Sequence, residues 1–186
     1  EKDNWQFGSG AGFYLDATIE PYNKNYNMYS YIKDELPELV GNNFDFDMSR
    51  QSIFGHSMGG HGALIIALRN PKNYKSCSAF APIVEPSTAT WSSEAFKKYI
   101  GPNKKDWEKY DSVALVRDGF YFPEILVDQG EADSFLNEGL RPWILEDVCR
   151  KSQINLKLRM QSGYDHSYFF ISTFMSDHLM WHKERI

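Results

Sequence analysis

The chain has 186 residues, of which 42% are hydrophobic and 24% are charged. These proportions match folded domains and exclude a disordered, collagen-like or low-complexity chain. The formal net charge is −5, so no excess of basic residues is available to neutralise a phosphate backbone, and we expect no binding to nucleic acid. The longest apolar run, residues 63–68, is far too short to cross a bilayer, so we expect no membrane partner.

Aromatic residues make up 16% of the chain, which suits either a large core or an aromatic-lined pocket. The two cysteines, Cys77 and Cys149, match no zinc or redox spacing. They could form one disulfide, but a lone pair more often indicates reduced thiols in an intracellular protein.

The N-terminal part combines a glycine-rich loop with a helix. Residues 5–12 are rich in glycine, but no lysine follows and no strand clearly precedes, so a nucleotide site is not expected there. Residues 29–40 carry apolar side chains at helical spacing. Pro37 interrupts this pattern and is expected to kink or end the helix.

Strands and helices then alternate to the end of the chain. Strands are predicted at residues 50–54, 76–84, 124–127 and 155–160, and helices at residues 63–68, 143–150 and 167–183. Residues 86–111 look irregular and are interpreted as an excursion or lid. The alternation predicts one α/β domain over residues 1–186, with a mostly parallel sheet flanked by helices.

Residues 55–59, Gly-His-Ser-Met-Gly, match the G-x-S-x-G nucleophile elbow, a sharp turn between a strand and a helix. Side chains at Gly55 and Gly59 are expected to collide with neighbouring backbone, which would explain both glycines. The turn would lift the Ser57 hydroxyl above the sheet and aim the Met58 amide at a developing oxyanion. The alternative is a glycine-rich turn with a solvated serine.

A serine hydroxyl needs a base to take its proton, and five histidines compete for that role. His166 follows the last predicted strand and precedes the last helix, where the base of an α/β-hydrolase belongs. His56 and His61 are expected to pack, to cap or to shape the pocket. His178 and His182 have the i, i+4 spacing of metal ligands, but no third ligand stands out. We therefore interpret both as surface or interface residues and expect no metal site.

The acid should follow the strand that precedes the strand of the histidine, and Asp128 and Asp133 both qualify, with Glu131 between them. Asp128 directly ends its strand, where a carboxylate often fixes a turn. Asp133 lies deeper in the loop, with room to reach His166. Spacing favours Asp133 as the acid but does not exclude Asp128. Asp165, next to His166, is expected to brace its own loop.

Five separated motifs together resemble one family, the S-formylglutathione hydrolases, also called esterase D. They are WQFGSGAGFYLDAT (5–18), YNMYSY (26–31), FGHSMGGHGAL (54–64), VDQGEADSFL (127–136) and GYDHSYFF (163–170). The resemblance implies an α/β-hydrolase fold and cleavage of S-formylglutathione to formate and glutathione. It places the nucleophile at Ser57, the acid at Asp133 and the base at His166. It also implies a cytoplasmic homodimer that needs no cofactor.

By the same resemblance, this chain begins about a third of the way into the family's sequence. The first strands of the sheet and a second oxyanion donor are therefore expected outside it, and the Met58 amide is the donor expected within it. Trp91 and Phe96, from residues 86–111, could line the thiol side of a site or belong to the core. Two alternative functions stay open: a general short-chain carboxylesterase, and a non-catalytic fragment.

Overall fold

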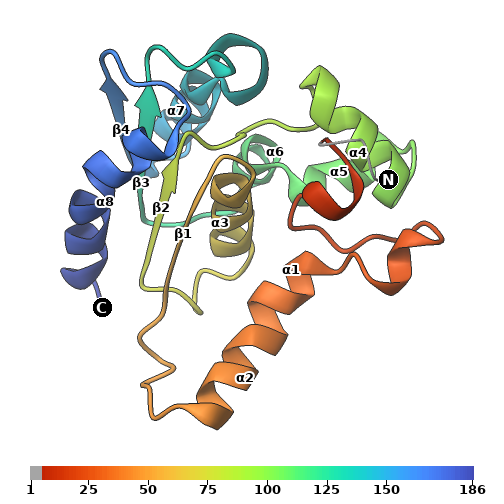
Figure 1. The fold of residues 1–186 in the computed structure, drawn as a ribbon, viewed down its shortest axis with the longest axis horizontal. Helices are drawn as coiled ribbons and strands as arrows, with labels where there is room; N and C mark the ends of the chain where they lie inside the picture. The colour runs from red at the N-terminus through yellow and green to blue at the C-terminus, as the bar shows by residue number, and fades with distance from the viewer. Residues whose placement is uncertain (1–5) are drawn as a thin grey trace.

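The computed structural model describes residues 6–186, except for the side chain of Trp91; Trp5, the start of the glycine-rich loop, lies outside the described residues. Four parallel strands form one sheet in the order β1-β2-β3-β4 (Figure 1). They are β1 (Ser52–His56), β2 (Ser76–Phe80), β3 (Glu124–Gly130) and β4 (Asn155–Gln161). The predicted α/β fold with a parallel sheet is confirmed.

Helices cover both faces of this sheet. The helices are α3 (Met58–Arg69), α6 (Ser112–Arg117) and α7 (Pro142–Lys151) on one face and α8 (Tyr168–Lys183) on the other. The alternation of side chains along β2 explains the division, because neighbouring residues of a strand point to opposite faces. Cys77 points toward α3, where its thiol lies 3.7 Å from the carbonyl of Ala63, whereas Ser76 and Ser78 point toward α8.

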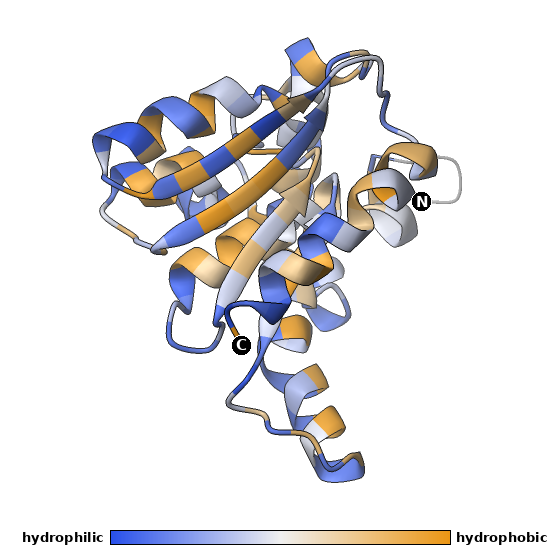
Figure 2. Ribbon diagram, turned by 90° about the vertical axis from the view of Figure 1, so that its left-hand side faces the viewer, coloured by the Kyte–Doolittle hydropathy of each residue, from blue (hydrophilic) through white to orange (hydrophobic). Residues whose placement is uncertain are grey.

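The strands differ in hydropathy according to their place in the sheet. Every residue of β2 is buried, and β3 is buried after its first residue. In contrast, β4 alternates between hydrophilic and hydrophobic residues along its length (Figure 2). This is the pattern of a strand at the edge of a sheet, with one solvated face. At the opposite edge, no other strand within residues 6–186 pairs with β1, and Phe54 there is 42% exposed.

The helix predicted at residues 29–40 is longer than expected. It consists of α1 (Met28–Ser30), a π-helical stretch (Tyr31–Glu35) and α2 (Leu36–Asn43). The helix continues past Pro37, because the wider π turn ahead of the proline accommodates a residue that lacks an N–H. In Figure 1 this segment projects away from the sheet.

The interpretation of residues 86–111 as irregular is wrong. They form α4 (Thr90–Ile100), α5 (Lys104–Trp107) and a 3-10 turn (Glu108–Tyr110). Phe96 and Tyr99 are fully buried, and the Tyr99 hydroxyl binds the backbone of the glycine-rich loop at Gly8 and Ala11. Phe96 therefore belongs to the core rather than to a pocket wall, while the side chain of Trp91 lies outside the described part. A lid role for these helices stays a prediction.

The other predicted elements lie close to the observed ones. The strand predicted at residues 76–84 ends earlier, at Phe80, and α3 begins five residues before the helix predicted at 63–68. Of the helices described in residues 6–186, none has the length and apolar character that crossing a bilayer requires.

Candidate active site

The turn between β1 and α3 has the strained geometry of a nucleophile elbow. Ser57 has φ 58° and ψ −116°, a conformation that non-glycine residues rarely adopt. A Cβ at Gly55 would lie 2.3 Å from the carbonyl oxygen of Gly59, closer than real Cβ atoms approach backbone. Residue 55 must therefore be glycine for the strand and the helix to meet so closely.

The same steric expectation is wrong for Gly59. A Cβ there would have Tyr14 Oη as its nearest neighbour, at 3.8 Å, which is an ordinary contact. The reason is that Gly59 lies in the first turn of α3, where its backbone carbonyl meets the strand at Gly55 and its Cβ position does not. Gly62 is the tighter position, since its Cβ would lie 2.5 Å from the ring of Tyr14. A glycine at position 62 indicates close packing, and the contact confirms it, but the sequence does not identify Tyr14 as the partner, because the contact forms only when the N-terminal segment folds over α3.

The structure brings Ser57, His166 and Asp133 together. His166 Nε2 lies 2.9 Å from Ser57 Oγ, and His166 Nδ1 lies 2.5 Å from Asp133 Oδ2. An ionised carboxylate only accepts hydrogen bonds, so Nδ1 carries the ring proton and Nε2 is free to accept the serine proton. The Asp133 side chain is fully buried, and its Oδ1 also accepts a hydrogen bond from the backbone N–H of Phe135 at 2.8 Å.

The structure places Asp128 in a separate network. Its carboxylate accepts two hydrogen bonds from Arg159, at 2.6 and 2.5 Å, and others from His178 and Gln161 at 3.1 Å. Burial acts to raise the pKa of Asp128, but the bonds from these three side chains outweigh it and hold the pKa below its usual value. Asp128 points toward α8 and Glu131 is exposed, so neither contacts His166.

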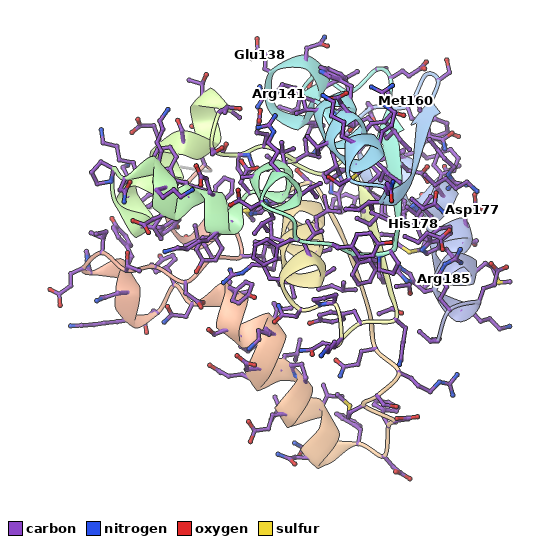
Figure 3. The ribbon with its side chains drawn as sticks, turned by 180° about the vertical axis from the view of Figure 1, so that it is seen from behind. Glu138, Arg141, Met160, Asp177, His178 and Arg185 are labelled. Carbon is purple, nitrogen blue, oxygen red and sulfur yellow. The ribbon has the colours of Figure 1, made fainter. Side chains whose placement is uncertain are left out.

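His178 and His182 are not surface residues, and that prediction is wrong. Both lie on the side of α8 that faces the sheet, and Figure 3 shows His178 turned inward while Asp177 points outward. His178 Nδ1 lies 2.8 Å from Ser78 Oγ, and the two ring nitrogens of His182 lie 2.7 and 2.8 Å from Ser76 and Ser78. Burial, with a smaller effect from His178, lowers the pKa of His182 to about 4.

No three of the described histidine, cysteine, aspartate and glutamate side chains are grouped so that they could hold a metal ion. Cys77 and Cys149 are both buried and unbonded. Burial raises the pKa of Cys149 to about 12, and it raises that of Cys77 as well, so both thiols stay protonated at neutral pH.

The two histidines that flank the serine have different surroundings. The ring of His56 packs against His166, with 4.4 Å between ring centroids, and burial lowers the pKa of His56 to about 4. His61 is fully buried and its Nε2 lies 3.0 Å from the carbonyl of Phe13. Burial lowers the pKa of His61 to about 4 as well, so both rings are neutral at pH 7. The Asp165 carboxylate accepts a hydrogen bond from the backbone N–H of Ser167 at 2.9 Å, within its own loop.

A backbone N–H at the start of α3 lies beside the serine. Met58 is the first residue of α3, so its N–H has no acceptor within the helix. The aligned peptide dipoles of α3 add a partial positive charge at the same end. This geometry suits a negative charge that develops next to Ser57.

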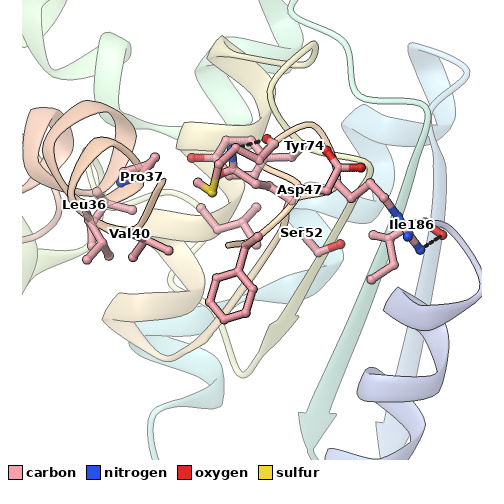
Figure 4. A pocket seen from close by; sticks show the side chains of 13 residues that line it. Leu36, Pro37, Val40, Asp47, Ser52, Tyr74 and Ile186 are labelled. Carbon is pink, nitrogen blue, oxygen red and sulfur yellow. Dashed lines mark hydrogen bonds between the residues drawn. The ribbon is translucent and has the colours of Figure 1, made fainter. Parts of the chain in front are cut away.

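Two cavities meet at Ser57 and His166. The smaller, about 210 Å³, is lined by apolar side chains that include Phe13, Ile83 and Leu140. The larger, about 570 Å³, lies along β1 and is lined by Tyr14 and His56 among others. A third cavity, about 490 Å³, lies between α2 and the start of β1, with Leu36 and Val40 at one end and Ile186 at the other (Figure 4). It contains none of the three residues brought together at the elbow.

Parallel strands, a strained serine between β1 and α3, and a histidine that follows β4 are the arrangement of the α/β-hydrolase fold. The family described as "Putative esterase" matches residues 1–181, and the chain belongs to this family. The chain is 51% identical over 187 residues to the S-formylglutathione hydrolase of Rattus norvegicus, and 50% identical over 189 residues to the S-formylglutathione hydrolase of Bos taurus. Each alignment covers 99% of this chain, and the chain spans 66% of the length of either relative.

Solved structures agree with this assignment. An S-formylglutathione hydrolase from Agrobacterium tumefaciens is 63% identical, with a TM-score of 0.98 over 100% of this chain and 67% of that one. The fluorophosphonate-binding serine hydrolase F of Staphylococcus aureus is 19% identical, with a TM-score of 0.74 over 92% of this chain and 67% of that one. The second likeness shows the shared fold alone.

Proposed function

We propose that this protein hydrolyses the thioester S-formylglutathione to formate and glutathione, with Ser57 as nucleophile, His166 as base and Asp133 as acid. The observation that carries the proposal is the position of His166, 2.9 Å from the serine hydroxyl and 2.5 Å from a buried carboxylate. The substrate is inferred from relatives at about 50% identity that bear this activity in their names.

In the first half of the reaction, His166 Nε2 takes the proton of Ser57 as Oγ attacks the formyl carbon. The carbonyl oxygen becomes an oxyanion beside the Met58 N–H, at the positive end of α3. Asp133 keeps the imidazole in the tautomer that can accept this proton and stabilises the resulting imidazolium. The C–S bond then breaks, and glutathione leaves as a thiolate that His166 can protonate.

In the second half, His166 takes a proton from a water molecule as that water attacks the formyl ester on Ser57. The ester bond to Oγ breaks, His166 returns the proton to Ser57, and formate leaves. Every proton is carried by a residue of this chain or by water, so the proposed reaction needs no cofactor.

The matched test compares Ser57→Ala with Ser52→Ala. Ser52 is the first residue of β1, the strand that leads to Ser57; it binds Ser76 and lies outside the triad. We expect kcat for S-formylglutathione to fall by roughly 10⁴-fold or more in Ser57→Ala and to stay within about twofold in Ser52→Ala. If Ser57→Ala keeps more than a few per cent of the wild-type activity, the proposal is wrong.

A general short-chain carboxylesterase is the second candidate, and the size of the smaller cavity favours it. At about 210 Å³, this cavity exceeds what a formyl group fills, since one water occupies about 30 Å³ in the liquid. The ratio of kcat/KM for S-formylglutathione to that for a short-chain aryl ester decides between the two. A ratio well above one supports S-formylglutathione hydrolysis as the function, and a ratio below one supports a general short-chain carboxylesterase.

We also propose a cytoplasmic homodimer, which the family resemblance supports. Light scattering coupled to size-exclusion chromatography tests the dimer directly, because a monomer mass would contradict it. A protein that folds but is inactive on both substrates would favour the remaining alternative, a non-catalytic fragment.

A further inference from the structure

A second side chain reaches the carboxylate that orients His166. Gln129, the residue before the end of β3, is fully buried, and its Nε2 lies 3.1 Å from Asp133 Oδ2. This is the same oxygen that accepts the bond from His166 Nδ1. The same amide nitrogen also lies 3.1 Å from the carbonyl oxygen of Gly130.

The partners fix the orientation of this amide. Both groups near the nitrogen, the Asp133 carboxylate and the Gly130 carbonyl, can only accept hydrogen bonds, so the NH₂ group must face them. The opposite orientation would set the amide oxygen against two other oxygens. The observed orientation leaves Oε1 of Gln129 buried and without a partner among the described residues. A buried acceptor left unpaired is unfavourable, which indicates that the amide is held for its donor.

Other contacts lock the segment around Gln129 to the loop that carries His166. The amide of Ala132 donates to the carbonyl of Tyr164 at 2.9 Å. A Cβ at Gly130 would lie 2.3 Å from that same carbonyl oxygen, so the two loops are in direct backbone contact. The backbone thus sets the distance between the loops, while the Gln129 amide and the Phe135 N–H set the orientation of the carboxylate between them.

We propose that Gln129 is a positioning residue for the reaction, an inference that rests on the proposed function. Its amide acts through Asp133 in two ways. It holds Oδ2 in line with His166 Nδ1, and it withdraws electron density from the carboxylate, which weakens the hold of Asp133 on an imidazolium.

The test replaces the donor while keeping the size of the side chain. Gln129→Met removes the amide, and Gln129→Glu replaces it with a carboxyl group beside Asp133. The control is Gln161→Met, the same change on the neighbouring strand, where the amide binds Asp128 at 3.1 Å and not Asp133. Two readouts are recorded for each protein: the NMR titration of the His166 ring carbon Cε1, and the pH profile of kcat/KM.

We expect Gln129→Met to raise the midpoint of the His166 titration by roughly half a pH unit, and Gln129→Glu by about one unit or more, since a nearby negative charge favours the imidazolium. The acid limb of kcat/KM should move by the same amount. In Gln129→Met, kcat should fall about tenfold while KM stays within about twofold, as expected when a reacting group is misplaced. Gln161→Met should change neither readout.

The proposal is overturned if both Gln129 variants fold and titrate His166 within about 0.2 units of wild type, or if Gln161→Met moves the midpoint equally. A loss of thermal stability with no change in midpoint would make Gln129 a purely structural residue and would also refute the proposal. The NMR titration needs no substrate. If the wild-type protein proves inactive, the proposed function fails, while the link from Gln129 to His166 is still measured.

Discussion

The elbow gives a sharp prediction, because the two glycines of its motif have opposite steric roles. In Gly55→Ala, the new Cβ meets Gly59 O at 2.3 Å and Gly59 C at 2.4 Å. Real Cβ atoms essentially never approach other atoms closer than 3.0 Å, so β1 and α3 must separate by at least about 0.7 Å. Both contacts are backbone, so no side-chain rotation relieves them.

The cost follows from this displacement. Forced overpacking in a close-packed interior costs about 1–3 kcal/mol of unfolding free energy. A misplacement approaching 1 Å at a reacting group lowers the rate by up to about 100-fold. Since Gly55 lies two residues before Ser57, we expect Gly55→Ala to lose roughly 2 kcal/mol and most of its kcat/KM. In Gly59→Ala the nearest atom is 3.8 Å away, and a helical alanine is favoured over glycine by up to about 1 kcal/mol.

Urea denaturation and steady-state kinetics on the two variants check this reasoning. We expect Gly59→Ala to be at least as stable as wild type and to keep its activity within about threefold. Equal losses in both variants would refute the steric account, because the motif would then need two glycines for a reason other than these contacts. Full activity in Gly55→Ala would refute it as well.

Three further predictions concern titratable side chains. Asp133→Asn should lower kcat by on the order of 10⁴-fold with little change in stability, because the wrong imidazole tautomer is then favoured. Asp128→Asn should keep the reaction but lose about 2 kcal/mol of unfolding free energy at pH 7, because it removes the buried charged partner of Arg159 and leaves that guanidinium only its contact with the exposed Asp177. Folding lowers the pKa of Asp128, so the stabilisation that its carboxylate provides is present above about pH 4 and is lost as the pH falls below that value. The difference in unfolding free energy between wild type and Asp128→Asn, measured by urea denaturation, should therefore shrink below about pH 4. Folding lowers the pKa of His61 from 6.5 to about 4, so between pH 4 and 6.5 the unfolded chain binds more protons than the folded protein, and the free energy of unfolding falls as the pH falls. In His61→Phe, the slope of the unfolding free energy against pH should be smaller by up to about 1.4 kcal/mol per pH unit. An unchanged slope would contradict this prediction.

The sequence predicted the sheet well because its strands carry strong local signals. β3 is an apolar segment with a turn signal after it, and β4 alternates in hydropathy, so both were placed within a few residues. The helix α4 was missed because its apolar residues are interleaved with polar ones. Its buried face is recognisable only once Tyr99 packs on the glycine-rich loop, which is far away in the sequence.

The geometry of the site was only partly within reach of the sequence. Spacing left both Asp128 and Asp133 open, and the separation comes from tertiary contacts: Arg159 on the neighbouring strand binds Asp128, while the loop carries Asp133 to His166. The burial of His178 under the sheet was also missed, because its hydrogen-bond partner is a serine a hundred residues away. Local patterns cannot identify such partners.

The most direct test of the central claim is chemical labelling of the native protein with a fluorophosphonate, followed by mass spectrometry of its tryptic peptides. Residues 51–69 form one tryptic peptide that contains both Ser52 and Ser57. An activated nucleophile predicts a single adduct on Ser57, with labelling that slows by at least about 100-fold in His166→Ala. A folded protein that stays unlabelled, or that is labelled on Ser52 instead, would contradict the account.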